Sequence, residues 1–118
     1  MIRLGLLGLG RWGKNIARTL REFSEVELIT ETVGAAQLDG VLIATPGSTH
    51  AEVAEPFIEK GLAVFIEKPF TTDLVAAKRL QQRAEESGAV VQVSHVHLFN
   101  PAYRAAKKLV QAGGAPRY

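Results

Sequence analysis

Short apolar runs alternate along the chain with segments of helical periodicity. The runs have the length expected of buried strands, and they cover residues 2–7, 26–29, 41–44, 62–66 and 90–93. The segments between them place apolar side chains on one helical face, as at Trp12, Ile16, Leu20 and Phe23. This alternation predicts one α/β domain over residues 1–118, a reduced Rossmann-like, doubly wound parallel sheet of about five strands.

The helix that follows the third strand has recognisable end signals. Thr49 and Glu52 have the spacing of a capping box, in which each side chain bonds the backbone of the other. Pro56 falls inside this helix and should kink it or remove a hydrogen bond. Gly61 suits the helix end.

Two further helices are predicted in the second half of the chain. Thr72 or Asp73 should cap the first of them. Asn100 followed by Pro101 predicts the start of the second, which should end near Gly113. The buried face of the first helix is expected to carry Leu74, Ala77, Leu80 and Ala84.

The composition is that of a globular protein, with 47% apolar and 22% charged residues. No apolar run approaches the roughly 20 residues that span a membrane, and we expect no secretion signal. The absence of cysteine excludes disulfides and thiolate metal sites and suits a cytoplasmic location. The net charge of +2 is too small and too evenly spread to indicate a nucleic-acid partner.

A G-x-G-x-x-G motif, GLGRWG at residues 8–13, lies between a predicted strand and a predicted helix. In this context Gly8 permits a tight turn, Gly10 lets the backbone approach a pyrophosphate, and Gly13 lets helix and strand pack closely. The helix start at Arg11 and Trp12 offers N–H groups to phosphates. The motif predicts binding of NAD or NADP, and the alternative is a tight turn that binds nothing.

Other residues at the same edge of the sheet are candidate cofactor contacts. Glu31 is the acidic residue nearest the position that would hold the ribose hydroxyls, although a solvated loop carboxylate explains it equally well. Thr45 and Pro46 end the third strand, where a ligand crevice is expected. His50 follows them, and a plain exposed side chain explains it better than catalysis.

Glu67 and Lys68 directly follow the fourth strand. A lysine at this edge would point into the same crevice, where partial desolvation beside a nicotinamide would help it to move a proton at a carbinol. Glu67 would be its partner or a structural anchor. The alternative is a surface ion pair, which position alone would favour.

His95 and His97 follow the fifth strand, and they share one face if the strand continues through them. Two such histidines could bind a metal, but no carboxylate or cysteine stands at a matching spacing. We therefore expect no metal, and a buried or crevice-lining role for His95.

Together these segments resemble the Gfo/Idh/MocA family of oxidoreductases. The resemblance covers almost the whole chain except residues 30–39. It is carried by GLGRWG, by VLIATPGSTHAEVA at 41–54, by EKP at 67–69 and by SHVHLFNPAYRAAKKLV at 94–110. It implies a Rossmann domain that binds NAD or NADP, with Lys68 in a catalytic or orienting role and His95 near the nicotinamide. In this family hydride passes between the cofactor and a secondary carbinol of a sugar or cyclitol.

The chain departs from the family pattern in two places. It is shorter than family members by a factor of about two to three, so the resemblance implies that the substrate domain and its D-x-x-H segment are absent. Residues 30–39, with at most a short helix, replace a whole strand and its flanking helices, and the usual ribose-binding acid would fall at Val33. The strand order then becomes 2-1-3-4-5, with a link near the lower limit of about a dozen residues for a crossover.

The expected function is cofactor binding in an oxidoreductase that acts on a sugar-like small molecule, with no activity in the isolated chain. The alternatives are a non-catalytic nucleotide-binding or regulatory module and a truncated scaffold that binds little. Affinity for NAD or NADP separates these two alternatives. Self-association into a homo-oligomer is a further expectation, because the missing domain would leave apolar surface uncovered.

Overall fold

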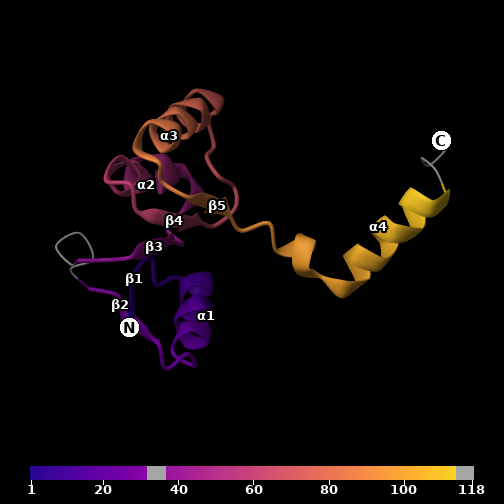
Figure 1. Cartoon of the computed structure of the whole chain (residues 1–118), viewed down its shortest axis with the longest axis horizontal. Coiled ribbons are helices and arrows are strands. Elements are labelled where there is room, and N and C mark those ends of the chain that lie inside the picture. Colours follow the sequence, from indigo (N-terminus) through magenta and orange to yellow (C-terminus); the bar gives the residue numbers. More distant parts are fainter. Residues whose placement is uncertain (32–36, 114–118) are drawn as a thin grey trace.

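The computed structural model describes residues 1–31 and 37–113 (Figure 1). The strands in these ranges are β1 (Ile2–Leu7), β2 (Val26–Ile29), β3 (Gly40–Ile43), β4 (Ala63–Ile66) and β5 (Val91–Val93). The helices are α1 (Arg11–Leu20), α2 (His50–Glu59), α3 (Leu74–Ser87) and α4 (Pro101–Gly113), with short 3-10 turns η2 (Gly47–Thr49) and η3 (Val96–Phe99). Each strand predicted from an apolar run is confirmed, with its ends shifted by no more than one residue.

The sheet is parallel, and its strand order is β2-β1-β3-β4-β5. The link from β2 to β3 passes β1. Two hydrogen bonds join the described end of this link to β1. The Arg3 N–H donates to the Asp39 carboxylate at 2.7 Å, and the Asp39 N–H donates to the Arg3 carbonyl at 2.9 Å. The reduced Rossmann-like sheet and its order are confirmed, whereas the short helix considered for 30–39 falls mainly outside the described residues.

Helices cover opposite faces of this sheet, as Figure 1 shows for α1 on one side and α2 and α3 on the other. Parallel crossovers are right-handed, so a chain that reverses direction at β1 must place α1 and α2 on different faces. Helices α2 and α3 are also joined by an ion pair between Arg79 and Glu55, with 3.0 Å between Nε and Oε1. The reversal opens a crevice at the carboxyl ends of the strands, beside β1 and β3.

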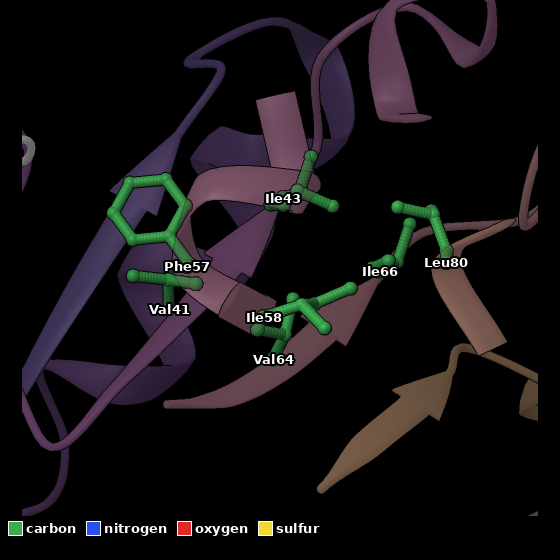
Figure 2. Packing of buried hydrophobic residues seen from close by; sticks show 8 residues of the cluster. Val41, Ile43, Phe57, Ile58, Val64, Ile66 and Leu80 are labelled. Atoms are coloured by element: carbon green, nitrogen blue, oxygen red, sulfur yellow. The ribbon is translucent and has the colours of Figure 1, made fainter. Parts of the chain in front are cut away.

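The main hydrophobic core lies between α2, α3 and the middle of the sheet (Figure 2). Alternate residues of β3 and β4 face the helices, because side chains alternate along a strand. Burying each large apolar side chain contributes about 1.5–3 kcal/mol, so this cluster stabilises the half of the sheet that carries the crevice. Its buried members are Val41, Ile43, Ala54, Phe57, Ile58, Val64, Ile66 and Leu80.

The C-terminal end of α2 forms as the sequence predicts, whereas its N-terminal end does not. Gly61 has a φ of +73°, and the N–H groups of Gly61 and Leu62 donate to the carbonyls of Ile58 and Phe57. This is the Schellman motif that a glycine after a helix predicts. The capping box expected at Thr49 is wrong, because its hydroxyl lies 2.7 Å from the Pro46 carbonyl and makes no capping bond.

Two predicted buried faces need correction. In α1 the buried residues are Gly13 and Ala17, while Trp12 is about half exposed. Phe23 is also about half exposed and lies beyond the end of the helix. The small residues let the helix lie close to β1, which leaves the large ones at its flanks. In α3 the buried residues are Ala76 and Leu80, and the predicted Leu74 is 69% exposed.

Helix α4 stands away from the rest of the chain (Figure 1). Asn100 caps it as predicted, accepting hydrogen bonds from the N–H groups of Ala102 and Tyr103. None of its residues is buried, and Leu109 is 75% exposed. The radius of gyration of 16.5 Å exceeds the roughly 13.5 Å expected of a compact domain of this length, as a projecting helix requires.

The cap of α3 is a test of local stability. The Asp73 carboxylate accepts hydrogen bonds from the N–H groups of Val75 and Ala76, at 3.2 and 2.9 Å. We expect Asp73→Ala to lower the free energy of unfolding by about 1 kcal/mol in urea. Thr72→Ala is the matched control and should change it by less than about 0.5 kcal/mol. Equal effects of the two variants would contradict the assignment of the cap to Asp73.

Candidate cofactor and active site

The glycine loop joins β1 to α1 through two close approaches. Gly8 has a φ of +95°, and a Cβ there would lie 2.5 Å from the carbonyl carbon of Ala44. A Cβ on Gly13 would overlap the Gly8 carbonyl oxygen. Gly8 is therefore packed against the end of β3, and Gly13 lets α1 lie directly on the loop, which fixes where the helix begins.

Gly10 differs from these two glycines because it faces open space. A Cβ added to it would meet nothing within 4 Å, and its backbone is extended, with φ −67° and ψ −166°. It caps α1 without a side-chain hydrogen bond, and no acidic residue lies in the first turn. The exposed Arg11 follows it. Free N–H groups at a helix start, with a cation beside them, suit a phosphate.

The end of β3 forms the floor of the crevice beside this loop. Thr45 is half-buried and Pro46 is exposed. The Thr45 hydroxyl lies 2.9 Å from the Thr49 hydroxyl, which ties the strand end to the turn before α2. The structure thus brings Thr45 close to the glycine loop, as the crevice hypothesis requires.

His50 lies behind this floor. It is 1% exposed, so the expectation of a plain exposed side chain is wrong. Its Nδ1 lies 2.7 Å from the Pro69 carbonyl oxygen and its Nε2 lies 2.9 Å from the Thr45 carbonyl oxygen. The ring therefore connects the end of β3 to the segment that follows β4.

Glu67 and Lys68 follow β4 on the same edge. Glu67 is buried, and its carboxylate accepts a hydrogen bond from the indole N–H of Trp12. Lys68 is exposed and forms no ion pair within the described part of the chain. The expected surface ion pair and the partnership of Glu67 with Lys68 are therefore wrong, and Glu67 is a structural anchor that holds Trp12, as the other alternative has it.

The segment after β5 turns instead of continuing as a strand. Ser94 is buried and its N–H donates to the Ile66 carbonyl at 2.8 Å, whereas His95 is exposed. Residues 96–99 form η3, so His95 and His97 are not on one strand face. No group of three or more potential metal ligands occurs in residues 1–31 and 37–113.

Two neighbouring hollows lie at this edge and share Lys68 and Val96. The first has a volume of about 310 Å³ and is lined by Trp12, Ala44, Thr45, Glu67, Lys68 and Val96. The second has a volume of about 420 Å³ and is lined by Lys68, Ser94, His95, Val96, His97, Leu98 and Tyr103. Lys68 therefore stands between a hollow beside the glycine loop and a hollow beside His95.

The structure does not bring every predicted residue into the crevice, and it adds two residues that were not predicted. Glu31 is exposed, two residues beyond β2, and Val33 lies outside the described residues. Tyr103 and Leu98 line the second hollow but were not among the candidates. Tyr103 could have been found from the Asn100 cap, because a capped helix start fixes which residues form its first turn.

A family model described as "Oxidoreductase family, NAD-binding Rossmann fold" matches residues 19–95 of the chain. The chain belongs to the Gfo/Idh/MocA family of oxidoreductases. The match begins after the glycine loop, so the reading of that loop rests on its own geometry. None of the helices in the described ranges is long and apolar enough to cross a membrane.

Relatives within this family are longer proteins. The chain is 39% identical over 83 residues to the scyllo-inositol 2-dehydrogenase (NAD(+)) of Bacillus subtilis (strain 168), a match that covers 69% of the chain and 24% of that enzyme. It is 44% identical over 84 residues to the UDP-N-acetylglucosamine 3-dehydrogenase of Acidithiobacillus ferrooxidans, which covers 70% of the chain and 26% of that enzyme.

A solved structure of this family matches almost the whole fold. The scyllo-inositol dehydrogenase of Lactobacillus casei, crystallised with bound NAD(H) and scyllo-inositol, superposes with a TM-score of 0.83 at 26% identity. The match covers 96% of the chain and 42% of that protein. The chain thus spans less than half the length of each of these relatives.

The buried His50 gives a test of how the crevice floor is held. His50→Phe keeps an aromatic ring but removes both nitrogens, which leaves two carbonyls without this partner. We expect the free energy of unfolding to fall by about 2–4 kcal/mol. His97→Phe, at an exposed position, is the control and should change it by less than about 0.5 kcal/mol. A loss in His50→Phe no larger than in the control would show that the ring does not hold the floor.

Proposed function

We propose that this domain binds NAD or NADP across the carboxyl edge of the sheet for hydride transfer to or from a sugar-like substrate. The single observation that carries the proposal is the position of Lys68 between two hollows, one beside the glycine loop and one beside His95. A dehydrogenase needs a proton-handling group where cofactor and substrate meet. Lys68 occupies such a place.

The cofactor would lie along the edge in a definite direction. Its pyrophosphate would rest on the N–H groups at the start of α1, beside Gly10 and Arg11, where the helix dipole favours negative charge. Its nicotinamide half would fill the hollow that contains Trp12 and Glu67. Its adenosine half would extend over β2, where Glu31 is the acid available for the ribose hydroxyls.

The chemistry divides between cofactor and protein. The nicotinamide, when bound, accepts or supplies the hydride. Lys68 would hold or move the proton of the carbinol oxygen. His95 would line the neighbouring hollow, where the substrate would bind. His50 would act indirectly, because it holds the Thr45 and Pro69 carbonyls that flank the Lys68 segment.

The substrate side is open in the described part of the chain. His95, His97, Leu98 and Tyr103 are all exposed, and α4 beyond them has no buried residue. The full-length relatives are more than twice as long, and the solved relative binds scyllo-inositol. We therefore propose a cyclitol or sugar as the substrate class of the complete enzyme, and self-association of the chain through the exposed face of α4.

Binding at the glycine loop can be tested without any substrate. Gly10→Val adds a side chain in space that is empty of protein atoms but that a pyrophosphate would need. We expect it to abolish binding of NADH and NADPH in calorimetry and to leave the chain folded, with only the modest loss of stability that valine causes at an N-cap. Gly113→Val is the matched control, since a Cβ there also meets nothing within 4 Å, and it should bind like the unaltered chain. Unchanged affinity in Gly10→Val would overturn the phosphate site.

Turnover by the chain alone is a separate prediction. Hydride transfer needs the carbinol carbon held about 3–3.5 Å from the nicotinamide, and an open substrate side provides no such constraint. We expect no change in NADH absorbance with inositols, sugars or sugar acids. Turnover above background that disappears in Lys68→Ala would contradict this and show that the chain is a complete enzyme. If longer forms of the protein also bind the cofactor without turnover, that result would favour a non-catalytic nucleotide-binding module.

A further inference from the structure

Trp12 and Glu67 form a contact that the hydride mechanism does not use. Trp12 lies in the first turn of α1, and its indole N–H donates to the carboxylate of Glu67 at the end of β4. The two residues are 55 positions apart in the sequence. Glu67 is 8% exposed, whereas Trp12 is 50% exposed. The hydrogen bond therefore holds an aromatic ring at the crevice with much of its surface still accessible.

The carboxylate of Glu67 has no cationic partner in the described part of the chain. None of the salt bridges there includes it, and its one hydrogen bond comes from a neutral indole. A buried carboxylate is ordinarily paired with a cation or several donors, because desolvation of a lone charge is unfavourable. The site is therefore electrostatically suited to a positive group arriving from outside.

The remaining walls of this hollow restrict the shape of that group. Ala44, Thr45 and Val96 are small, and the volume of about 310 Å³ is at the lower end of the range for small-molecule sites. The hollow suits a ring and its immediate substituents better than a larger group. A planar cation can stack on an indole face, which is the aromatic surface that attracts cations most strongly.

From these observations we propose that Trp12 and Glu67 form a subsite that selects the oxidised nicotinamide ring, which is planar and positively charged, over the neutral reduced ring. The proposal rests on the proposed function, since it places the nicotinamide in this hollow. Trp12 supplies the stacking face and Glu67 supplies the negative charge. The Lys68 ammonium on the same hollow opposes this attraction, but it is exposed, so water and salt screen it.

The test compares affinities for NAD+ and NADH by calorimetry. Glu67→Gln keeps an oxygen that can accept from the Trp12 indole but removes the charge, and Trp12→Leu removes the aromatic face. Each variant should lose about three- to thirtyfold in affinity for NAD+ and less than twofold for NADH. Glu31→Gln is the contrasting variant, because a residue at the distant ribose should weaken NAD+ and NADH by the same factor.

A spectroscopic readout supports the same test, because Trp12 is the only tryptophan in the chain. Saturation with NAD+ should quench its fluorescence, with a midpoint equal to the calorimetric dissociation constant. Equal losses of NAD+ and NADH affinity in both variants, or unquenched fluorescence at saturation, would overturn the subsite while leaving cofactor binding intact. If neither NAD+ nor NADH binds to the unaltered chain, the proposed function and the subsite are both overturned. Trp12→Leu changes a half-exposed residue, so it decides the question even if Glu67→Gln fails to fold.

Discussion

The contact between α1 and the loop that precedes it is the constraint on which the rest of the site depends. Because Gly13 has no side chain, the first turn of α1 lies directly against the Gly8 carbonyl, and Gly8 in turn lies against the backbone at the end of β3. These approaches set the helix start at the reversal point of the sheet. Without them, the N–H groups at the start of α1 would not reach the edge where the parallel strands end and where Lys68 lies.

Polar contacts between distant segments then hold that edge in shape. His50 fixes the segment after β4 to the end of β3, and the Trp12 indole fixes the start of α1 to Glu67. Hydrogen bonds that are largely shielded from water are stronger than exposed ones. The crevice is thus supported by His50 beneath its floor and by Trp12 beside the glycine loop. Within residues 1–31 and 37–113, no such side-chain contact joins the segment beyond His95 to the sheet.

The sequence predicted the parts of this fold that depend on local patterns. The strands followed from apolar runs, and the ends at Gly61 and Asn100 followed from capping preferences. It failed where tertiary contacts decide the outcome. Thr49 bonds Pro46 instead of capping α2, and Leu74 is exposed because Ala76 and Leu80 are the buried residues of α3. His50 is buried, and its ring meets the carbonyl of Pro69, 19 residues further along the chain. The Trp12–Glu67 bond joins residues too distant for spacing to reveal.

On the function proposed above, NAD or NADP occupies the carboxyl edge of the sheet and no other surface. A hollow of about 700 Å³ between α3 and β5 is a rival site, with a mostly apolar lining that includes Phe70, Leu74 and Val91. Backbone amide NMR of the chain during titration with NADH distinguishes the two. We predict shift changes at Gly10, Trp12, Thr45 and Lys68, with Leu74 and Val91 unaffected. Changes confined to the hollow between α3 and β5 would contradict the account.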